Sequence, residues 1–287
     1  MVTIDHRIVV RSAGLDLTLA VREHPAPARS GSAPPLVVLH GFTGSARTMD
    51  VVAEPLAVGR RALGVDLVGH GHSDAPASVA AYRMEACVDQ VLAVVGDLTT
   101  GPVDLVGYSM GGRVALSLAV TTPDAIRSLV LIGASAGLSD PAEAQARRAA
   151  DERLATSIET EGLPAFVDRW MGLPMWRSLE AAEGPEGWAG SRRQRLDSDP
   201  VGLALSLRGM GTGVQPPVHD QLAALDRPAL VLAGELDTKF TAIAHELGAA
   251  LSQAGVEIVP GAGHAAHRER PDLVVGLIAD FLDRLDG

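Results

Sequence analysis

A serine with a glycine two positions away on each side is the clearest sign of chemistry in this chain. Residues 107–111 read Gly-Tyr-Ser-Met-Gly, the pattern G-x-S-x-G, with the serine at Ser109. An apolar stretch at 103–106 predicts a strand before it, and 113–119 predicts a helix after it. A serine on such a sharp strand-to-helix turn exposes its hydroxyl, and only small residues fit around it. Because a serine hydroxyl is a weak nucleophile or base alone, a histidine and an acid must support it.

Both supporting residues occur later in the chain. Asp237 follows an apolar stretch at 229–234, and His264 follows a short strand-like stretch at 256–259. The order serine, acid, histidine, with each residue after a predicted strand, is typical of the α/β-hydrolase fold. The alternative is a glycine-rich turn with an uninvolved serine, but the three ordered residues favour a catalytic triad.

A second loop supplies the rest of the predicted catalytic apparatus. The apolar stretch at 36–39 ends in His40, Gly41 and Phe42. In this fold the loop after that strand provides one backbone N–H of an oxyanion hole, and the residue after the nucleophile provides the other. The two residues are Phe42 and Met110. His40 is interpreted as a structural residue of the loop rather than as a base.

Composition limits the classes of function that are open to the chain. Its 287 residues are 47% hydrophobic and 21% charged, which allows a sizeable core in one large α/β domain with an insertion, or in two small domains. The formal net charge is −11. This acidity argues against a nucleic-acid partner, because phosphate binding needs a basic surface.

The single cysteine and the N-terminus bear on location. Cys87 falls in a helical apolar pattern and is interpreted as a core or half-buried thiol, and one cysteine cannot form an internal disulfide, which suits a reducing cytosol. Residues 1–10 lack the apolar centre of a signal peptide, and no apolar stretch approaches the length of a membrane span. We therefore expect a cytoplasmic protein without membrane insertion.

Predicted strands and helices alternate over most of the chain, which implies a mostly parallel central sheet flanked by helices. Further strands are expected at 15–21, 61–66 and 127–132, further helices at 49–56 and 82–98, and a proline-rich loop at 22–35.

One long segment breaks this alternation. From 139 to 209 there is no convincing strand, and the segment carries many arginines and all three tryptophans. We interpret it as an inserted helical cap over Ser109 that excludes water and contacts the substrate. The α/β-hydrolase core is then expected in two parts, 1–138 and 210–287.

Arg113 lies four residues after Ser109, about one turn into the predicted helix. A cation near the buried start of a helix needs a partner, and a substrate carboxylate is a natural one. The alternative is a salt bridge at the boundary between core and cap.

Five segments together resemble one family. They are LHGFTGS at 39–45, GYSMGGR at 107–113, GTGVQP at 211–216, GELDTKF at 234–240 and AGHAAHRE at 262–269. The triad segments alone fit many α/β hydrolases. The GTGVQP and LDTKF segments, with the arginine after S-M-G-G, resemble the 2-succinyl-6-hydroxy-2,4-cyclohexadiene-1-carboxylate synthases of menaquinone biosynthesis, from about residue 36 to the C-terminus.

The resemblance implies a carbon–oxygen lyase that eliminates pyruvate from 2-succinyl-5-enolpyruvyl-6-hydroxy-3-cyclohexene-1-carboxylate without an acyl-enzyme. It implies that Ser109 is the base, activated by His264, which Asp237 orients. The backbone N–H groups of Phe42 and Met110 would stabilise the negative charge that develops. The substrate is a small polycarboxylate, and the residues that match its ligands in the family are Tyr108, Arg113, Arg147, Trp170 and Arg195.

No cofactor and no metal site are expected. His70 and His72 lie in a glycine-rich loop without a second pair of ligands and are interpreted as stabilising that loop. No G-x-G-x-x-G segment follows a strand, so no nucleotide is implied. His267 is expected to flank the site.

Two other classes of function stay open. A serine hydrolase, either a carboxylesterase or a C–C bond hydrolase, would use the same triad through an acyl-enzyme or an activated water. An esterase for neutral lipids would line its cap with apolar residues, so Arg113, Arg147 and Arg195 favour the lyase. A non-enzymatic binder on this scaffold would not need an intact triad.

Overall fold

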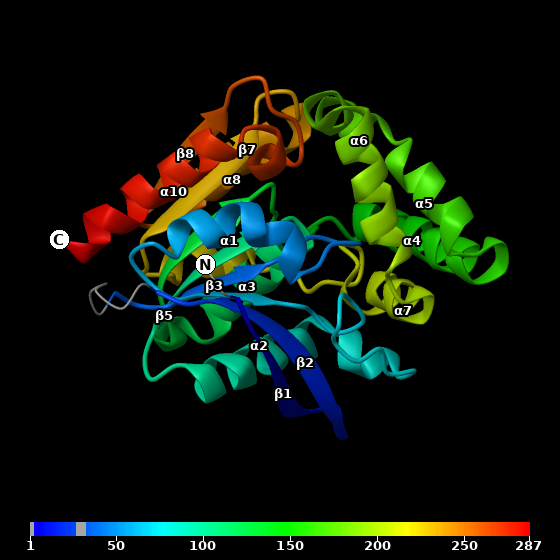
Figure 1. Cartoon of the computed structure of the whole chain (residues 1–287), viewed down its shortest axis with the longest axis horizontal. Coiled ribbons are helices and arrows are strands. Elements are labelled where there is room, and N and C mark those ends of the chain that lie inside the picture. The colour runs from blue at the N-terminus through cyan, green and yellow to red at the C-terminus, as the bar shows by residue number, and fades with distance from the viewer. Residues whose placement is uncertain (1–2, 27–32) are drawn as a thin grey trace.

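The computed structural model describes residues 3–26 and 33–287. Its strands are β1 (Ile4–Ser12), β2 (Leu15–His24), β3 (Leu36–Leu39), β4 (Ala62–Val65), β5 (Val103–Tyr108), β6 (Ile126–Ile132), β7 (Ala229–Gly234) and β8 (Ala254–Val259). They form one sheet in the order β1-β2-β4-β3-β5-β6-β7-β8 (Figure 1). β1 with β2 and β2 with β4 pair antiparallel, and all other neighbours pair parallel. This mostly parallel sheet confirms the predicted fold class.

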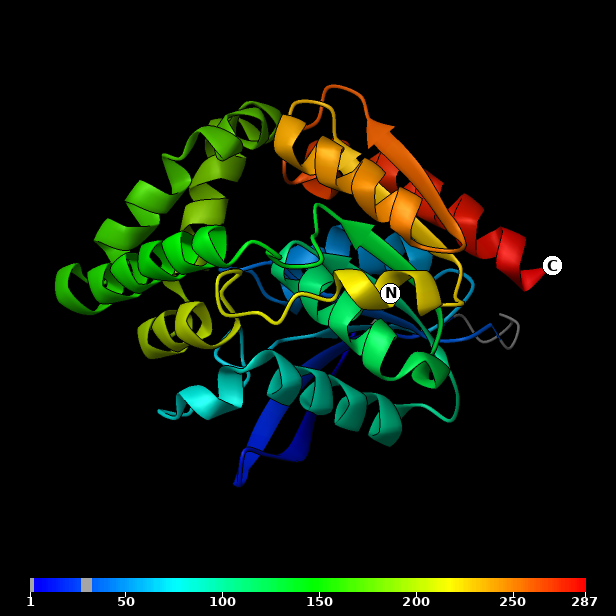
Figure 2. The same ribbon diagram turned by 180° about the vertical axis from the view of Figure 1, so that it is seen from behind.

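Helices cover both faces of the sheet. α1 (Asp50–Leu56) and α10 (Pro271–Asp286) lie in front of it in Figure 1, whereas α2 (Met84–Leu98), α3 (Met110–Thr121) and α8 (Thr238–Ala250) lie in front in Figure 2. Side chains alternate along each strand, so Leu36 and Val38 pack with α1 and α10, and Val37 and Leu39 pack with α2, α3 and α8. Because both faces are covered, the parallel strands are apolar along their length.

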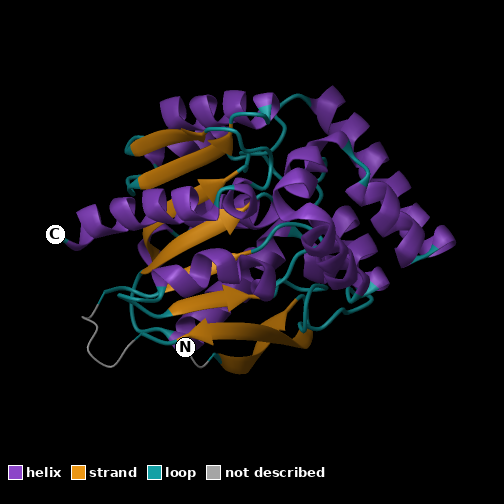
Figure 3. Cartoon of the chain, turned by 45° about the horizontal axis from the view of Figure 1, so that its top comes forward, coloured by secondary structure: helices purple, strands orange, loops and turns teal. Residues whose placement is uncertain are grey.

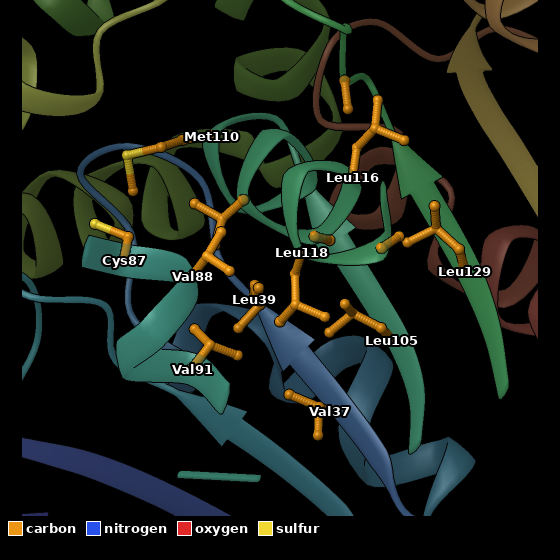
Figure 4. Close-up of a cluster of buried hydrophobic side chains, with 14 of the residues drawn as sticks. Val37, Leu39, Cys87, Val88, Val91, Leu105, Met110, Leu116, Leu118 and Leu129 are labelled. Carbon is orange, nitrogen blue, oxygen red and sulfur yellow. The ribbon is translucent and has the colours of Figure 1, made fainter. Parts of the chain in front are cut away.

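The larger core cluster lies between the sheet and α2 and α3. Figure 4 shows side chains of the strands, such as Leu39 and Leu105, with Cys87 and Val91 of α2 and Leu118 of α3. Cys87 is a free, fully buried thiol, the first of the two environments that the sequence allows, and burial raises its pKa.

The predicted elements differ from the observed ones mainly at their ends. β2 continues to His24, so the predicted loop at 22–35 starts too early, and its residues 27–32 lie outside the described residues. The sequence does not predict β1, because most of its side chains are exposed and its apolar pattern is weak; Val9 is 69% exposed.

Four α-helices fill the stretch between β6 and β7: α4 (Pro141–Glu161), α5 (Leu163–Met171), α6 (Arg177–Leu196) and α7 (Pro200–Met210). Residues 139–209 are all described and contain no strand. Figure 3 shows the arrowheads of the parallel strands pointing toward these helices, where the loops after the strands also gather. The division of the chain at 139 and 209 stays a prediction. No helix in the described residues is long and apolar enough to cross a membrane.

Candidate active site

The turn at Ser109 has the strained geometry that the sequence pattern predicts. β5 ends at Tyr108 and α3 begins at Met110, and Ser109 between them has φ 51° and ψ −109°. A Cβ on Gly107 would lie 2.5 Å from the Cα of Gly112, so only glycine fits there. A non-glycine residue in this backbone region costs about 1–3 kcal/mol, which the surrounding packing must offset.

The three triad side chains meet in one hydrogen-bonded line. Nε2 of His264 lies 3.1 Å from Oγ of Ser109, and its Nδ1 lies 2.8 Å from Oδ2 of Asp237. Nδ1 donates to the carboxylate, so Nε2 is left to accept the proton of the serine hydroxyl. Burial raises the pKa of Asp237, but the hydrogen bond and charge of His264 outweigh burial and hold it below its usual value. The line can therefore move a proton away from Ser109.

The predicted oxyanion-hole residues lie beside Ser109. Met110 is the first residue of α3, where backbone N–H groups have no partner within the helix. The loop that carries Phe42 approaches from the other side, since a Cβ on Gly41 would lie 2.7 Å from the Tyr108 ring and 3.5 Å from Cβ of Ser109. The start of a helix favours negative charge at this point.

His40 holds this loop in place. Its Nδ1 donates to the carbonyl of Gly41 at 2.8 Å, and its Nε2 accepts from the N–H of Leu67 at 3.0 Å. Burial lowers the pKa of His40 to about 4, so the ring is neutral and is a structural part of the loop, as expected. His70 packs against it with ring centroids 5.1 Å apart, and burial lowers the pKa of His70 to about 3.

Aromatic rings from the helical segment and from the core surround His264. The centroids of Phe240, Tyr108 and Trp176 lie 4.7, 5.6 and 5.9 Å from that of His264. Trp170 lies 5.4 Å from Phe42 and 6.0 Å from Trp176. Tyr108 thus lies next to His264 and Trp170 next to Phe42, and their role as substrate ligands stays a prediction. The sequence does not single out Trp176 and Phe240, although Phe240 belongs to the GELDTKF segment.

Several buried polar atoms of residues around the site have no hydrogen-bond partner in the described part of the chain, and most of them are donors. Tyr108 Oη, the indole Nε1 atoms of Trp170 and Trp176, Nε of Arg195 and Oγ1 of Thr43 are buried without a hydrogen-bond partner in the described residues. Each such group costs about 1–3 kcal/mol if nothing satisfies it. Four of the five are an aromatic O–H or N–H or a guanidinium N–H, so they suit a ligand rich in acceptor oxygens.

Two of the predicted arginines, Arg113 and Arg195, are buried without an ion pair among the described residues. Arg113 donates to the carbonyl of Met210 at 2.7 Å and to Oε1 of Gln215 at 2.8 Å. Arg195 donates to the carbonyl of Ser191 at 3.0 Å and lies over the ring of Trp176. Burial lowers the pKa of each guanidinium to about 10. Neither forms an ion pair within the described residues, so both can take a carboxylate from a ligand.

Arg147 differs from these two. It is 41% exposed and its Nε donates to Asp151 at 2.8 Å, four residues along α4. It lies close enough to Arg113 for its charge to lower the pKa of Arg113. Gln215 accepts the second hydrogen bond of Arg113, although the sequence does not single it out. The one sequence feature that could have indicated its role is the GTGVQP segment that contains it.

Among residues 3–26 and 33–287, no group of three histidine, cysteine, aspartate or glutamate side chains could hold a metal ion. His70 instead pairs its Nδ1 with the carbonyl of Val68 at 3.1 Å, which fits a role in stabilising its loop. His267 is buried and its ring lies 4.2 Å from that of Tyr108, so it flanks the site as expected.

Comparison with known proteins places this geometry in a family. Residues 34–271 match the model of the α/β hydrolase fold. A Bacillus subtilis protein named as a 2-succinyl-6-hydroxy-2,4-cyclohexadiene-1-carboxylate synthase is 38% identical over 86% of this chain and 89% of its own. The structure of MenH from S. aureus superposes with a TM-score of 0.87 at 30% identity, over 93% of this chain and 99% of the other. A thermophilic esterase from Thermogutta terrifontis follows at a TM-score of 0.81 and 26% identity, over 97% and 98% of the two chains. The chain therefore belongs to the 2-succinyl-6-hydroxy-2,4-cyclohexadiene-1-carboxylate synthase family within the α/β-hydrolase fold.

Proposed function

We propose that this protein is a carbon–oxygen lyase of menaquinone biosynthesis. It eliminates pyruvate from 2-succinyl-5-enolpyruvyl-6-hydroxy-3-cyclohexene-1-carboxylate and releases 2-succinyl-6-hydroxy-2,4-cyclohexadiene-1-carboxylate. The observation that carries the proposal is a pair of buried guanidinium groups that form no ion pair within the described residues: Arg113, one helical turn after Ser109, and Arg195, which borders the same cavity as Tyr108. A substrate with succinyl, enolpyruvyl and ring carboxylates supplies the missing partners.

The triad acts as a base in this reaction. Ser109 takes the acidic ring proton next to the succinyl carbonyl, while its own proton passes to Nε2 of His264, and Asp237 stabilises the imidazolium. The electrons of the broken C–H bond move toward the carbonyl oxygen. They then form a double bond between ring carbons 2 and 3, the double bond between carbons 3 and 4 shifts to carbons 4 and 5, and the C–O bond from carbon 5 to the enolpyruvyl group breaks. The leaving oxygen is protonated, and the enol becomes pyruvate, so no acyl-enzyme is needed.

The oxyanion hole stabilises the charge that this proton transfer creates. The N–H groups of Phe42 and Met110 would donate to the succinyl carbonyl oxygen as it becomes negative, and the start of α3 adds its dipole. Donors of this kind each contribute about 10²–10³ in rate in acyl-transfer enzymes. Enolate formation also creates a negatively charged oxygen, so the N–H groups of Phe42 and Met110 would stabilise it in the same way.

The cap and the elbow helix hold the carboxylates. Arg113, Arg147 and Arg195 are the proposed anion ligands, and Tyr108 and Trp170 donate their unpaired O–H and N–H to the same ligand. The aromatic walls exclude water, which strengthens each of these charge-assisted hydrogen bonds. We place the reaction in the cytoplasm.

A serine hydrolase is the second candidate, because the same triad can form an acyl-enzyme and the fold also houses esterases. The unpaired buried arginines argue against a neutral ester as substrate. A hydrolase that accepts a carboxylated ester would fit them, so turnover must decide.

A pyruvate-release assay tests the proposal. Purified protein receives freshly generated 2-succinyl-5-enolpyruvyl-6-hydroxy-3-cyclohexene-1-carboxylate, with p-nitrophenyl acetate as a neutral ester in parallel. We expect release well above the spontaneous rate, and a fall of about 10³-fold or more in Ser109→Ala, whose melting temperature should stay near that of the wild type. Brisk ester cleavage without pyruvate release would move the protein to the hydrolases. Undiminished release by Ser109→Ala would remove the serine from the mechanism.

A further inference from the structure

Arg195 forms no ion pair in the part of the chain that the structure describes, yet its place in the site is well defined. It lies near the end of α6, it is 4% exposed, and the carbonyl of Ser191 one turn earlier holds one of its nitrogens at 3.0 Å. The centre of its guanidinium lies 5.6 Å from the Trp176 ring. The position of Arg195 therefore depends on what fixes Ser191.

Ser191 is fixed by a buried polar network that joins the cap to the core. Its hydroxyl donates to Oε2 of Glu183 at 2.6 Å and accepts from the guanidinium of Arg268 at 2.7 Å. Arg268 also forms an ion pair with Glu183, whose side chain is only 11% exposed. Arg268 belongs to α9 (Ala266–Glu269) of the core, whereas Glu183 and Ser191 belong to α6 of the cap.

The network lies across a break in α6. Gly184 has φ 66° and interrupts the helix, so Glu183 ends its first half and Ser191 lies in its second. The second half also carries Arg195. Because Arg268 contacts both Glu183 and Ser191, it holds the two halves at a fixed angle and fixes the direction in which Arg195 enters the site.

The same short helix also holds the catalytic histidine. The carboxylate of Glu269 accepts the N–H of Gly263 at 2.7 Å and that of Ala265 at 3.1 Å, the two residues on either side of His264. Adjacent residues of α9 thus have different tasks. Glu269 fastens the loop of His264, and Arg268 fastens the helix of Arg195.

We propose that Arg268 is a positioning residue that sets Arg195 relative to His264 through Ser191 and Glu183. The inference rests on the proposed function, in which Arg195 binds a substrate carboxylate. Arg268 also borders the small cavity that contains Arg195 and Tyr108, so direct contact with the substrate is the competing role. A Glu183 variant distinguishes the two roles. If Arg268 positions Arg195, loss of Glu183 disorders Arg268 and weakens substrate binding. If Arg268 binds the substrate directly, loss of Glu183 frees Arg268 for the substrate.

Steady-state pyruvate release by a set of single variants tests the proposal. Arg268→Gln should raise KM about tenfold and change kcat less than about threefold, because Arg195 is misplaced while the triad is intact. Glu183→Gln should also raise KM, and Arg268→Lys should recover part of the loss by keeping the ion pair. Arg270→Gln is the matched control. Arg270 lies two residues further on, and within the described residues its side chain hydrogen-bonds to the carbonyl of Pro260 at 3.3 Å, so the KM of this variant should not change.

A double variant adds the decisive comparison. Arg195→Ala should raise KM more than Arg268→Gln, and adding Arg268→Gln to it should change KM by less than about twofold, since residues that act through one another are not additive. Additive effects, an unchanged KM in Arg268→Gln, or a lower KM in Glu183→Gln would each overturn the proposal.

A binding measurement keeps this test separate from that of the lyase activity. Succinate, a simple dicarboxylate, is titrated while the tryptophan emission is followed, because Trp176 lies beneath Arg195. If the wild type releases no pyruvate but binds succinate, and Arg268→Gln and Arg195→Ala both weaken that binding, the lyase proposal fails and the positioning role stands. Equal binding by the wild type and Arg268→Gln, or no binding by the wild type, would overturn the positioning role.

Discussion

Two groups of arginines lie at opposite ends of β5, and they differ in whether a carboxylate pairs with them. Asp104 near the start of β5 accepts from Arg60 at 2.5 Å and from Arg127 at 2.6 and 2.8 Å, and Asp286 pairs with both arginines. We call these four residues the paired cluster. Ser109 follows the other end of β5, where the hydrogen bonds of Arg113 and Arg195 among the described residues all go to neutral acceptors. We call these two the open cluster.

The difference separates structural charge from functional charge. A buried guanidinium without a counter-charge lowers stability, and a protein that needed only a stable fold would pair it or replace it by an apolar residue. The paired cluster satisfies this requirement and fastens α10 and β6 to the start of β5. The open cluster does not satisfy it within the protein alone. We infer that its counter-charge arrives with the substrate.

The largest effect should follow from breaking the paired cluster. Asp104→Ala leaves two largely buried guanidinium groups with Asp286 alone, and we expect the free energy of unfolding in urea to fall by about 3–5 kcal/mol. Turnover per folded molecule should stay the same, because the change lies at the far end of β5 from Ser109. A loss below about 1 kcal/mol would mean that water screens these pairs as it screens surface pairs, and the contrast would fail.

An arginine-to-methionine substitution should have different consequences in the paired cluster and in the open cluster. Arg60→Met leaves part of the Asp104 charge uncompensated and should cost about 2 kcal/mol of stability, whereas Arg113→Met removes an unpaired charge and should change stability by less than about 1 kcal/mol. Activity should show the reverse. Arg113→Met should raise KM for the polycarboxylate substrate by about tenfold or more, with little effect on p-nitrophenyl acetate cleavage, and Arg60→Met should change neither. Equal loss of both activities in Arg113→Met would make Arg113 a structural residue.

The sequence predicts the residues around Ser109 and the open cluster better than those of the paired cluster. Ser109, Asp237 and His264 follow strands with strong apolar patterns, and small residues must surround the elbow, so local pattern is enough to find them. Arg113 is close to Ser109 in sequence, and its distance from the site follows from helix geometry.

The parts that the sequence does not predict depend on contacts between distant residues. Asp104 and Asp286 are 182 positions apart, and nothing in either local segment indicates that they share Arg60 and Arg127. β1 is missed because it is an exposed edge strand whose pairing with β2 is specified by backbone hydrogen bonds rather than by apolar side chains. Trp176 is one of three tryptophans in the cap, and only the packing of α6 on α9 decides that it faces His264.

The smallest predicted effect concerns acid, and it should also distinguish the two ends. His40 and His70 are buried beside the oxyanion loop with pKa values lowered to about 4 and about 3, against 6.5 when unfolded. Between pH 6.5 and 4 the opened chain binds more protons than the folded one. The stability that these two rings contribute is therefore complete above pH 6.5 and decreases as the pH is lowered. The amide of Leu67, which is bonded to His40, should lose up to about tenfold of its hydrogen-exchange protection per pH unit for each of the two rings that its opening exposes. Amides of β5 near Asp104 should change less, and His40→Asn should weaken the trend at Leu67. Equal loss of protection at both ends would show that acid opens the molecule as a whole rather than from the catalytic end.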